Sequence, residues 1–171
     1  MIVFFGDHGQ HLGEHGGLYR KTSLFEEAAR SPMIWAAPGI TKAGGVSQRP
    51  VDFLSIFPTL TELCGIPANP VAEGFSLISL LKNPDAAWPH SAVTTLAWKG
   101  TVGHSIRTDR YRYNEWDNGK QGRELYDHET DPQEYKNLAD NPKYKKQVDE
   151  LHEEIVRTVA RPNNIKSSVG D

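Results

Sequence analysis

The feature that most constrains the fold is an apolar run at residues 2–5, Ile-Val-Phe-Phe, which stops at Gly6-Asp7-His8-Gly9. A continuous apolar run of this length is typical of a strand buried on both faces of a parallel sheet. Such a strand needs neighbours on both sides, and no segment precedes it in this sequence. We therefore expect an upstream part of the protein to be missing.

A second apolar run at residues 33–37 predicts another buried strand. Between the two runs, five glycines in residues 6–17 predict a loop rather than a helix. Residues 21–30 then predict a helix, which Pro32 ends. The alternation of strand, loop, helix and strand predicts an α/β fold with part of a parallel sheet.

Residues 52–64 carry apolar side chains at helical spacing, and we expect Pro58 to kink or restart this helix. A proline-rich stretch at residues 66–90, with one short amphipathic piece at 76–81, predicts a boundary between two subdomains. The chain is therefore expected to divide into residues 1–90 and residues 91–171.

The second part has a different pattern. Four short segments rich in strand-forming residues predict a small antiparallel sheet. They are residues 92–98, 104–108, 111–116 and 124–126. After Asn141-Pro142, a typical helix start, an apolar stripe indicates a helix packed across this sheet. The stripe consists of Val148, Leu151, Ile155 and Val159.

Composition excludes several classes of protein. The net charge of −3 argues against a nucleic-acid or anionic-membrane partner. No apolar run approaches the roughly 20 residues that a membrane helix needs. The single cysteine, Cys64, excludes an internal disulfide and a multi-thiolate zinc site.

Asp7 and His8 are the strongest candidates for chemistry. In α/β sheets, ligands bind beyond the carboxyl ends of the strands, where these two residues are expected. A carboxylate and an imidazole side by side can bind Ca²⁺, Mg²⁺, Mn²⁺ or Zn²⁺. The sequence alone leaves open a second interpretation, in which Asp7 caps a turn and His8 is a solvated loop residue.

Other charged residues have competing interpretations. His8, His11 and His15 are spaced for a three-histidine zinc site only on a helix, which the glycines disfavour. Lys21 suits a sulfate or phosphate oxygen, although it could also be an exposed residue at a helix start. Three arginines of the second part, Arg107, Arg110 and Arg112, fit a solvated strand face better than a nucleic-acid surface.

The order of several motifs resembles the type I sulfatases of the alkaline phosphatase superfamily. The first part carries Gly6-Asp7-His8-Gly9, Leu12-Gly13-Glu14-His15-Gly16, Lys21, Phe57-Pro58-Thr59-Leu60 and Cys64-Gly65-Ile66. The second part carries Glu124-Leu125-Tyr126-Asp127, Asp131-Pro132 and Asn137-Leu138-Ala139. Ser105-Ile106-Arg107-Thr108 and Tyr111-Arg112-Tyr113 are similar to the iduronate-2-sulfatase branch.

The resemblance implies the C-terminal part of a sulfatase, with a partial alkaline-phosphatase-like parallel sheet followed by a small antiparallel sheet and a C-terminal helix. It implies that Asp7 and His8 hold a divalent cation, expected to be Ca²⁺ with Mg²⁺ or Zn²⁺ as alternatives. Lys21 is expected to contact sulfate, and His11 and His15 to face the substrate. That substrate would be a sulfated carbohydrate or another sulfate ester.

The resemblance also implies a nucleophile outside the chain. Sulfatases oxidise the first residue of Cys-x-Pro-x-Arg or Ser-x-Pro-x-Arg to formylglycine, and Cys64-Gly65-Ile66-Pro67 does not fit this motif. The fragment alone is therefore expected to be inactive. Members of the family are usually exported or lysosomal. Two alternatives are a metal-dependent phosphodiesterase or phosphatase of the same superfamily, and an inactive stand-alone module.

Overall fold

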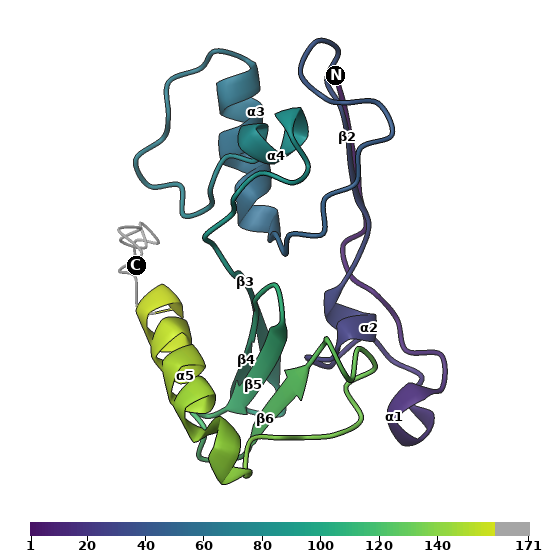
Figure 1. Ribbon diagram of the computed structural model, residues 1–171, viewed down its shortest axis with the longest axis vertical. Coiled ribbons are helices and arrows are strands. Elements are labelled where there is room, and N and C mark those ends of the chain that lie inside the picture. The colour runs from purple at the N-terminus through teal and green to yellow at the C-terminus, as the bar shows by residue number, and fades with distance from the viewer. Residues whose placement is uncertain (160–171) are drawn as a thin grey trace, which may run out of the picture.

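The computed structural model describes residues 1–159 and contains two separate sheets (Figure 1). The first sheet pairs β1 (Ile2–Phe5) with β2 (Met33–Ala36), and the second contains four strands near the C-terminus. Residues 160–171, the end of the predicted second subdomain, lie outside the described residues. The division of the chain at residue 90 stays a prediction.

The two apolar strands pair antiparallel, with Val3 opposite Trp35 and Phe4 opposite Ile34. The prediction that they belong to a parallel sheet is therefore wrong for this pair. The physical reason is the path of residues 6–32. They leave the carboxyl end of β1 and return to that same end, so β2 starts beside it and runs in the opposite direction. There the Gly6 N–H donates to the Pro32 carbonyl at 3.0 Å. Burial also differs, because Ile2 is 68% exposed and no described element covers it.

The helices of the first part are short. α1 (Glu14–Gly17) is one distorted turn, in which His15 has a φ of 50° and Gly16 a φ of 80°, within the stretch where the glycine content predicted a loop. The helix predicted at residues 21–30 forms only as α2 (Glu26–Ala29), because the backbone is still extended at Phe25.

A 3₁₀ turn (Phe53–Ser55) leads into α3 (Ile56–Leu63), and α4 (Ile78–Lys82) follows. Pro58 lies in the first turn of α3, so the helix starts anew near this proline, as one of the two expectations had it, and is not kinked by it. The N–H groups of that turn have no partner within a helix, so the missing donor costs nothing.

The second sheet is an antiparallel meander in the order β3-β4-β5-β6, close to the predicted segments. Its strands are β3 (Ala92–Trp98), β4 (Thr101–Arg107), β5 (Tyr111–Trp116) and β6 (Arg123–Asp127). Ile106 lies opposite Tyr113, and Tyr113 lies opposite Leu125. This register places three buried apolar side chains in one line across the sheet.

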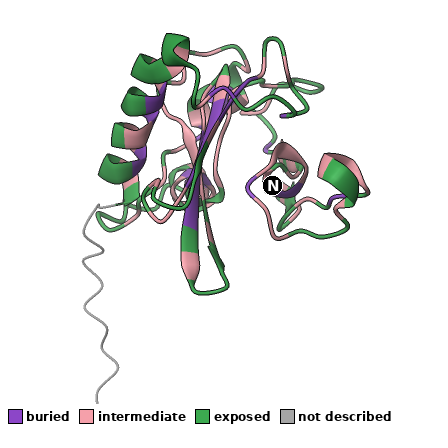
Figure 2. Ribbon diagram, turned by 90° about the horizontal axis from the view of Figure 1, so that it is seen from below, coloured by how far each residue is buried: buried purple, intermediate pink, exposed green. Residues whose placement is uncertain are grey.

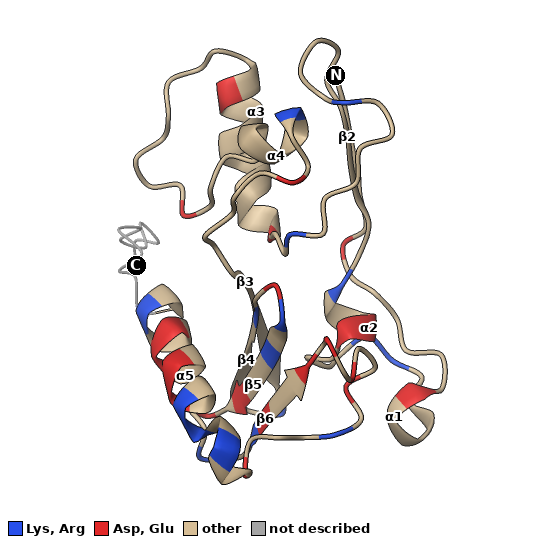
Figure 3. Ribbon diagram, in the orientation of Figure 1, with Lys and Arg blue, Asp and Glu red and all other residues tan. Residues whose placement is uncertain are grey.

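The C-terminal helix covers that line. The Asn141 side chain accepts a hydrogen bond from the Lys143 N–H, Pro142–Tyr144 forms a 3₁₀ turn, and α5 (Lys145–Val159) follows. Val148, Leu151 and Ile155 are buried in the core, as predicted, whereas Val159 is exposed. Figure 2 shows the buried side of α5 turned toward the sheet, and Figure 3 shows acidic and basic positions following one another along the helix.

We predict that Leu151→Ala destabilises the fold by about 2–5 kcal/mol, because it removes a buried side chain between α5 and the sheet. Urea denaturation of the chain measures this change. Val156→Ala on the exposed side of the same helix is the matched control and is expected to change stability by less than about 0.5 kcal/mol. A loss for Leu151→Ala no larger than that of the control would contradict the packing described here.

The opposite face of the sheet is tied to α2 by buried charges. Arg112 on β5 pairs with Glu26 of α2 and, at 2.5 Å between Nε and Oε1, with Glu134. Glu134 also accepts a hydrogen bond from the Glu26 N–H at 2.8 Å and contacts His128 Nε2 at 2.7 Å. The prediction that Arg112 lies on a solvated strand face is therefore wrong. Its guanidinium joins the first part of the chain to the second.

The same contacts act on the pKa of Glu26. Burial alone would raise this pKa, but attraction and hydrogen bonding to Arg112 outweigh burial, so the pKa lies below its ordinary value of 4.5. A carboxyl group with a lowered pKa in the folded state contributes stability above its unfolded pKa, and loses it as the pH falls through the folded pKa.

We therefore predict that the free energy of unfolding decreases as the pH falls below about 4.5, and that Glu26→Gln makes this decrease shallower. Chemical denaturation of both proteins between pH 7 and pH 3 measures the two slopes. Equal slopes would show that Glu26 binds protons equally in the folded and unfolded states.

Among the described residues, no helix has both the length and the apolar character required to cross a membrane.

Candidate metal centre

The loop after β1 is held against α2 by its backbone. The Gly9 N–H donates to the Ala28 carbonyl at 2.8 Å, and the Ser31 hydroxyl donates to the Gly6 carbonyl at 2.8 Å. A Cβ atom at Gly9 would lie 1.9 Å from the Glu27 carbonyl oxygen, so only glycine permits this approach. The two glycines thus fix the positions of Asp7 and His8 between them.

The Asp7 and His8 side chains converge in the structure. Asp7 Oδ2 lies 3.5 Å from His8 Nε2, and both residues are exposed. His8 Nδ1 lies 2.8 Å from the Gly9 carbonyl oxygen, which can only accept a hydrogen bond. In the neutral imidazole, Nδ1 therefore carries the proton and Nε2 keeps a free lone pair. Metal-binding histidines are typically oriented by such a bond from the other ring nitrogen.

The Lys21 side chain reaches the same point from the far end of the loop. Its Nζ lies 2.9 Å from His8 Nε2 and donates a hydrogen bond to that lone pair. The structure thus brings together three of the five candidate residues, Asp7, His8 and Lys21. An oxygen donor, a nitrogen donor and a cation at one exposed point fit a divalent cation with an anion beside it.

The two remaining candidates, His11 and His15, form a separate cluster. His11 is 0% exposed, and its Nε2 lies 2.7 Å from the Ser23 hydroxyl oxygen. His15 stacks on Phe25 at 3.9 Å between ring centres and contacts Glu27 Oε2 at 3.1 Å. Complete burial leaves no His11 atom at the surface of the described chain for a substrate to contact.

This second cluster could also hold an ion. One donor atom from each of His11, His15 and Glu27 lies within 4.8 Å of the other two, and the buried His11 Nδ1 has no hydrogen-bond partner. The three-histidine arrangement considered from spacing does not form, because His8 contacts Lys21 rather than this cluster. Sequence reasoning missed Ser23 and Glu27, since nothing in the local pattern indicates which histidine each one meets.

The fold and the site define a class of protein: an α/β segment that presents a carboxylate, an imidazole and an ammonium group at one exposed point. Within that class, the family model described as "N-sulphoglucosamine sulphohydrolase, C-terminal" matches residues 13–161. The chain therefore belongs to the sulfatase family and corresponds to its C-terminal portion. Asp7 and His8 precede the matched residues, and Lys21 lies within them.

Similar proteins are described as sulfatases. A sulfatase of Formosa agariphila is 36% identical over 94% of this chain and 30% of its own length. The delta 4,5-hexuronate-2-O-sulfatase of Bacteroides thetaiotaomicron is 34% identical over 85% of this chain and 32% of its own length. The chain thus spans about a third of the length of these relatives.

One similar solved structure contains a sulfated sugar. It is a protein in complex with its substrate D-glucosamine-2-N,6-O-disulfate, 26% identical to this chain with a TM-score of 0.82. The similarity covers 96% of this chain and 36% of the other. Both sheets and α5 therefore belong to the sulfatase fold.

Proposed function

We propose that this chain supplies part of the metal and sulfate site, together with the C-terminal subdomain, of an enzyme that hydrolyses sulfate esters of sugars. The observation that carries the proposal is the convergence of Asp7, His8 and Lys21 at the end of β1. Two further features support a longer protein around it. The chain spans a third of its relatives, and the apolar side chains of Ile2 and Phe4 are exposed.

In this proposal Asp7 and His8 hold a divalent cation, which we take to be Ca²⁺. When bound, the cation supplies charge stabilisation to the sulfate group and to the attacking nucleophile. The nucleophile, a formylglycine, lies in the missing N-terminal part. Lys21 neutralises the sulfate. A cation and the Lys21 ammonium compete for the lone pair of His8 Nε2, so metal binding frees Lys21 for the anion.

The substrate class is proposed from the relatives. One is named as a hexuronate-2-O-sulfatase, and another is bound to a glucosamine disulfate. We therefore propose a sulfated sugar, and an enzyme of the iduronate-2-sulfatase branch. We propose supporting roles for His11 and His15, which hold the loop between Gly9 and Lys21 in place through their contacts with Ser23 and Glu27.

We predict that the isolated chain binds Ca²⁺ with a dissociation constant no tighter than about 10⁻⁴ M, because two residues supply few of the 6–8 oxygens that Ca²⁺ prefers. A titration followed by NMR should shift the backbone signals of Asp7 and His8, and Asp7→Ala should remove the response.

The same titration tests the alternatives. Shifts confined to His11, His15 and Glu27 would place the ion in the buried cluster and contradict the proposed site. Tight Zn²⁺ binding at Asp7 and His8, with no response to Ca²⁺, would favour the phosphatase alternative.

A further inference from the structure

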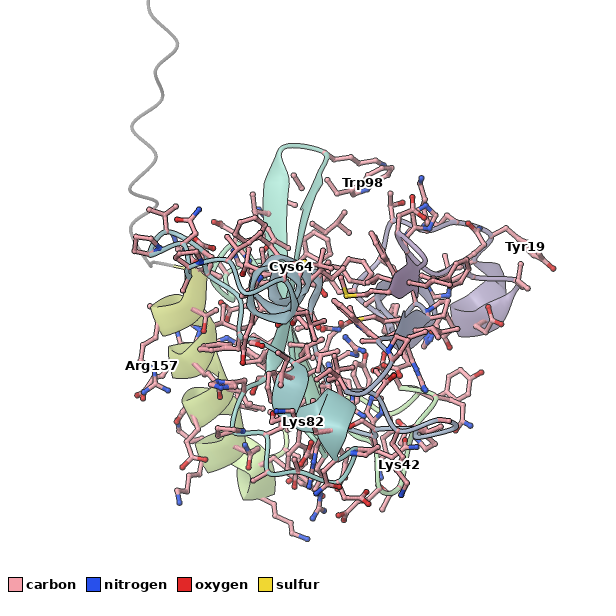
Figure 4. All side chains as sticks on the ribbon, turned by 90° about the horizontal axis from the view of Figure 1, so that it is seen from above. Tyr19, Lys42, Cys64, Lys82, Trp98 and Arg157 are labelled. Atoms are coloured by element: carbon pink, nitrogen blue, oxygen red, sulfur yellow. The ribbon has the colours of Figure 1, made fainter. Side chains whose placement is uncertain are left out.

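The β3–β4 hairpin ends in an exposed aromatic side chain. Trp98, 39% exposed, pairs with Thr101 across a two-residue turn in which Lys99 has a φ of 50° and Gly100 a φ of 81°. Positive φ at both turn residues defines a tight turn that matches the twist of the strands. The hairpin therefore holds Trp98 at its tip, where Figure 4 labels it.

This tip meets the segment that carries Lys21. The Arg20 guanidinium carbon lies 5.9 Å from the centre of the Trp98 ring, and Lys99 Nζ lies 5.7 Å from it. Arg20 directly precedes Lys21, so the contact joins the second sheet to the loop of the candidate metal centre. Both distances fall in the range at which an indole attracts a cation.

Arg20 and Lys99 are exposed, and within residues 1–159 neither forms an ion pair with a carboxylate. Several other arginines of the chain do, among them Arg30, Arg49 and Arg110. Both cations lie within 5.9 Å of the centre of one ring, so a negative group near Trp98 is attracted by both. The planar guanidinium is also suited to a carboxylate or a sulfate, which it can bind through two parallel hydrogen bonds.

We propose that Arg20, Trp98 and Lys99 form a second anion subsite, which binds a carboxylate or sulfate group of the substrate other than the sulfate ester at Lys21. The proposal rests on the proposed function and extends it. It implies that the substrate is an acidic sugar with at least two negative groups. It also gives the second sheet a part in selecting that substrate.

The test is an NMR titration of the full chain, in saturating Ca²⁺, with two sugars. D-Glucosamine-2-N,6-O-disulfate carries two sulfate groups, and N-acetyl-D-glucosamine-6-O-sulfate carries one and has no charged amine. We expect the disulfate to bind roughly tenfold more tightly, as one additional charge-assisted hydrogen-bonded contact predicts, and to shift the Trp98 indole N–H signal. Trp98→Phe identifies that signal by its loss.

Variants separate the two sites. Arg20→Gln should remove most of the preference for the disulfate and leave binding of the monosulfate unchanged. Lys21→Ala should weaken both sugars. Lys82→Gln is the matched control, since it removes one exposed charge far from Trp98 and should change neither affinity (Figure 4). A third titration, with a 2-O-sulfated hexuronate, supplies a carboxylate as the second anion. A shift of the Trp98 indole signal with the disulfate or with this hexuronate supports the subsite.

Either of two results would overturn the subsite. The first is equal affinity for the disulfate and the monosulfate, together with an unmoved Trp98 signal in all three titrations. The second is a preference for the disulfate that survives Arg20→Gln. A different result would contradict the proposed function itself: no shift of the Asp7, His8 and Lys21 signals with either glucosamine sulfate.

Discussion

Lys21→Ala is expected to lower kcat/KM for a sulfate ester by about 10²–10³-fold in the intact enzyme that contains this chain, the size of effect seen when one charge-stabilising donor is removed from an active site. In the structure the Lys21 ammonium lies 2.9 Å from His8 Nε2, at the point where Asp7 also converges. In the proposed function, a fixed cation at that point stabilises the negative charge of the sulfate group throughout the reaction. Steady-state kinetics with a sulfated sugar measure the loss.

Lys42→Ala is the matched control for Lys21→Ala, because Lys42 is an exposed lysine in another part of the chain (Figure 4). Its kinetics should equal those of the unmodified enzyme. Unchanged kinetics for Lys21→Ala as well would remove Lys21 from the site.

The second large effect concerns stability. Arg112→Ala is expected to destabilise the chain by about 3–5 kcal/mol, because it leaves the buried Glu134 carboxylate without its cationic partner. Since Arg112 also pairs with Glu26, the variant should loosen α2 from the second sheet. Chemical denaturation at pH 7 measures the free energy of unfolding.

Arg30→Ala provides a control on the same carboxylate. Arg30 also pairs with Glu26, at 3.3 Å, but its side chain is 75% exposed. Exposed ion pairs contribute about 0–1 kcal/mol, so its loss should be small. Equal losses for the two arginines would show that burial does not decide the strength of the Arg112 contacts.

The second sheet and α5 were predictable because their signals are local. The Lys99-Gly100 turn, the strand-forming segments and the stripe from Val148 to Ile155 each specify one element within a few residues. The antiparallel pairing of β1 with β2 was not predictable from the two apolar runs. A run of apolar residues indicates burial, and carries no information about the direction of the neighbouring strand.

The candidate site was predictable in part for the same reason. Asp7 and His8 are adjacent in sequence, so their convergence needed only a strand end and a tight loop. The partners of Glu26 and Trp98 are far along the chain: Arg112 lies on β5, and Arg20 directly precedes Lys21. Contacts between distant segments depend on how the two sheets are placed relative to each other. The residue spacing within either segment does not predict that placement.

The central claim is that this chain carries metal and sulfate ligands of a sulfatase whose nucleophile lies elsewhere. The most direct measurement is hydrolysis of a chromogenic aryl sulfate in millimolar Ca²⁺, by the purified chain and by the intact enzyme that contains it. We predict no turnover above background for the folded chain, and turnover by the intact enzyme that Asp7→Ala abolishes. Turnover by the chain alone that Asp7→Ala removes would contradict the claim, since it would place a complete catalytic site within these 171 residues.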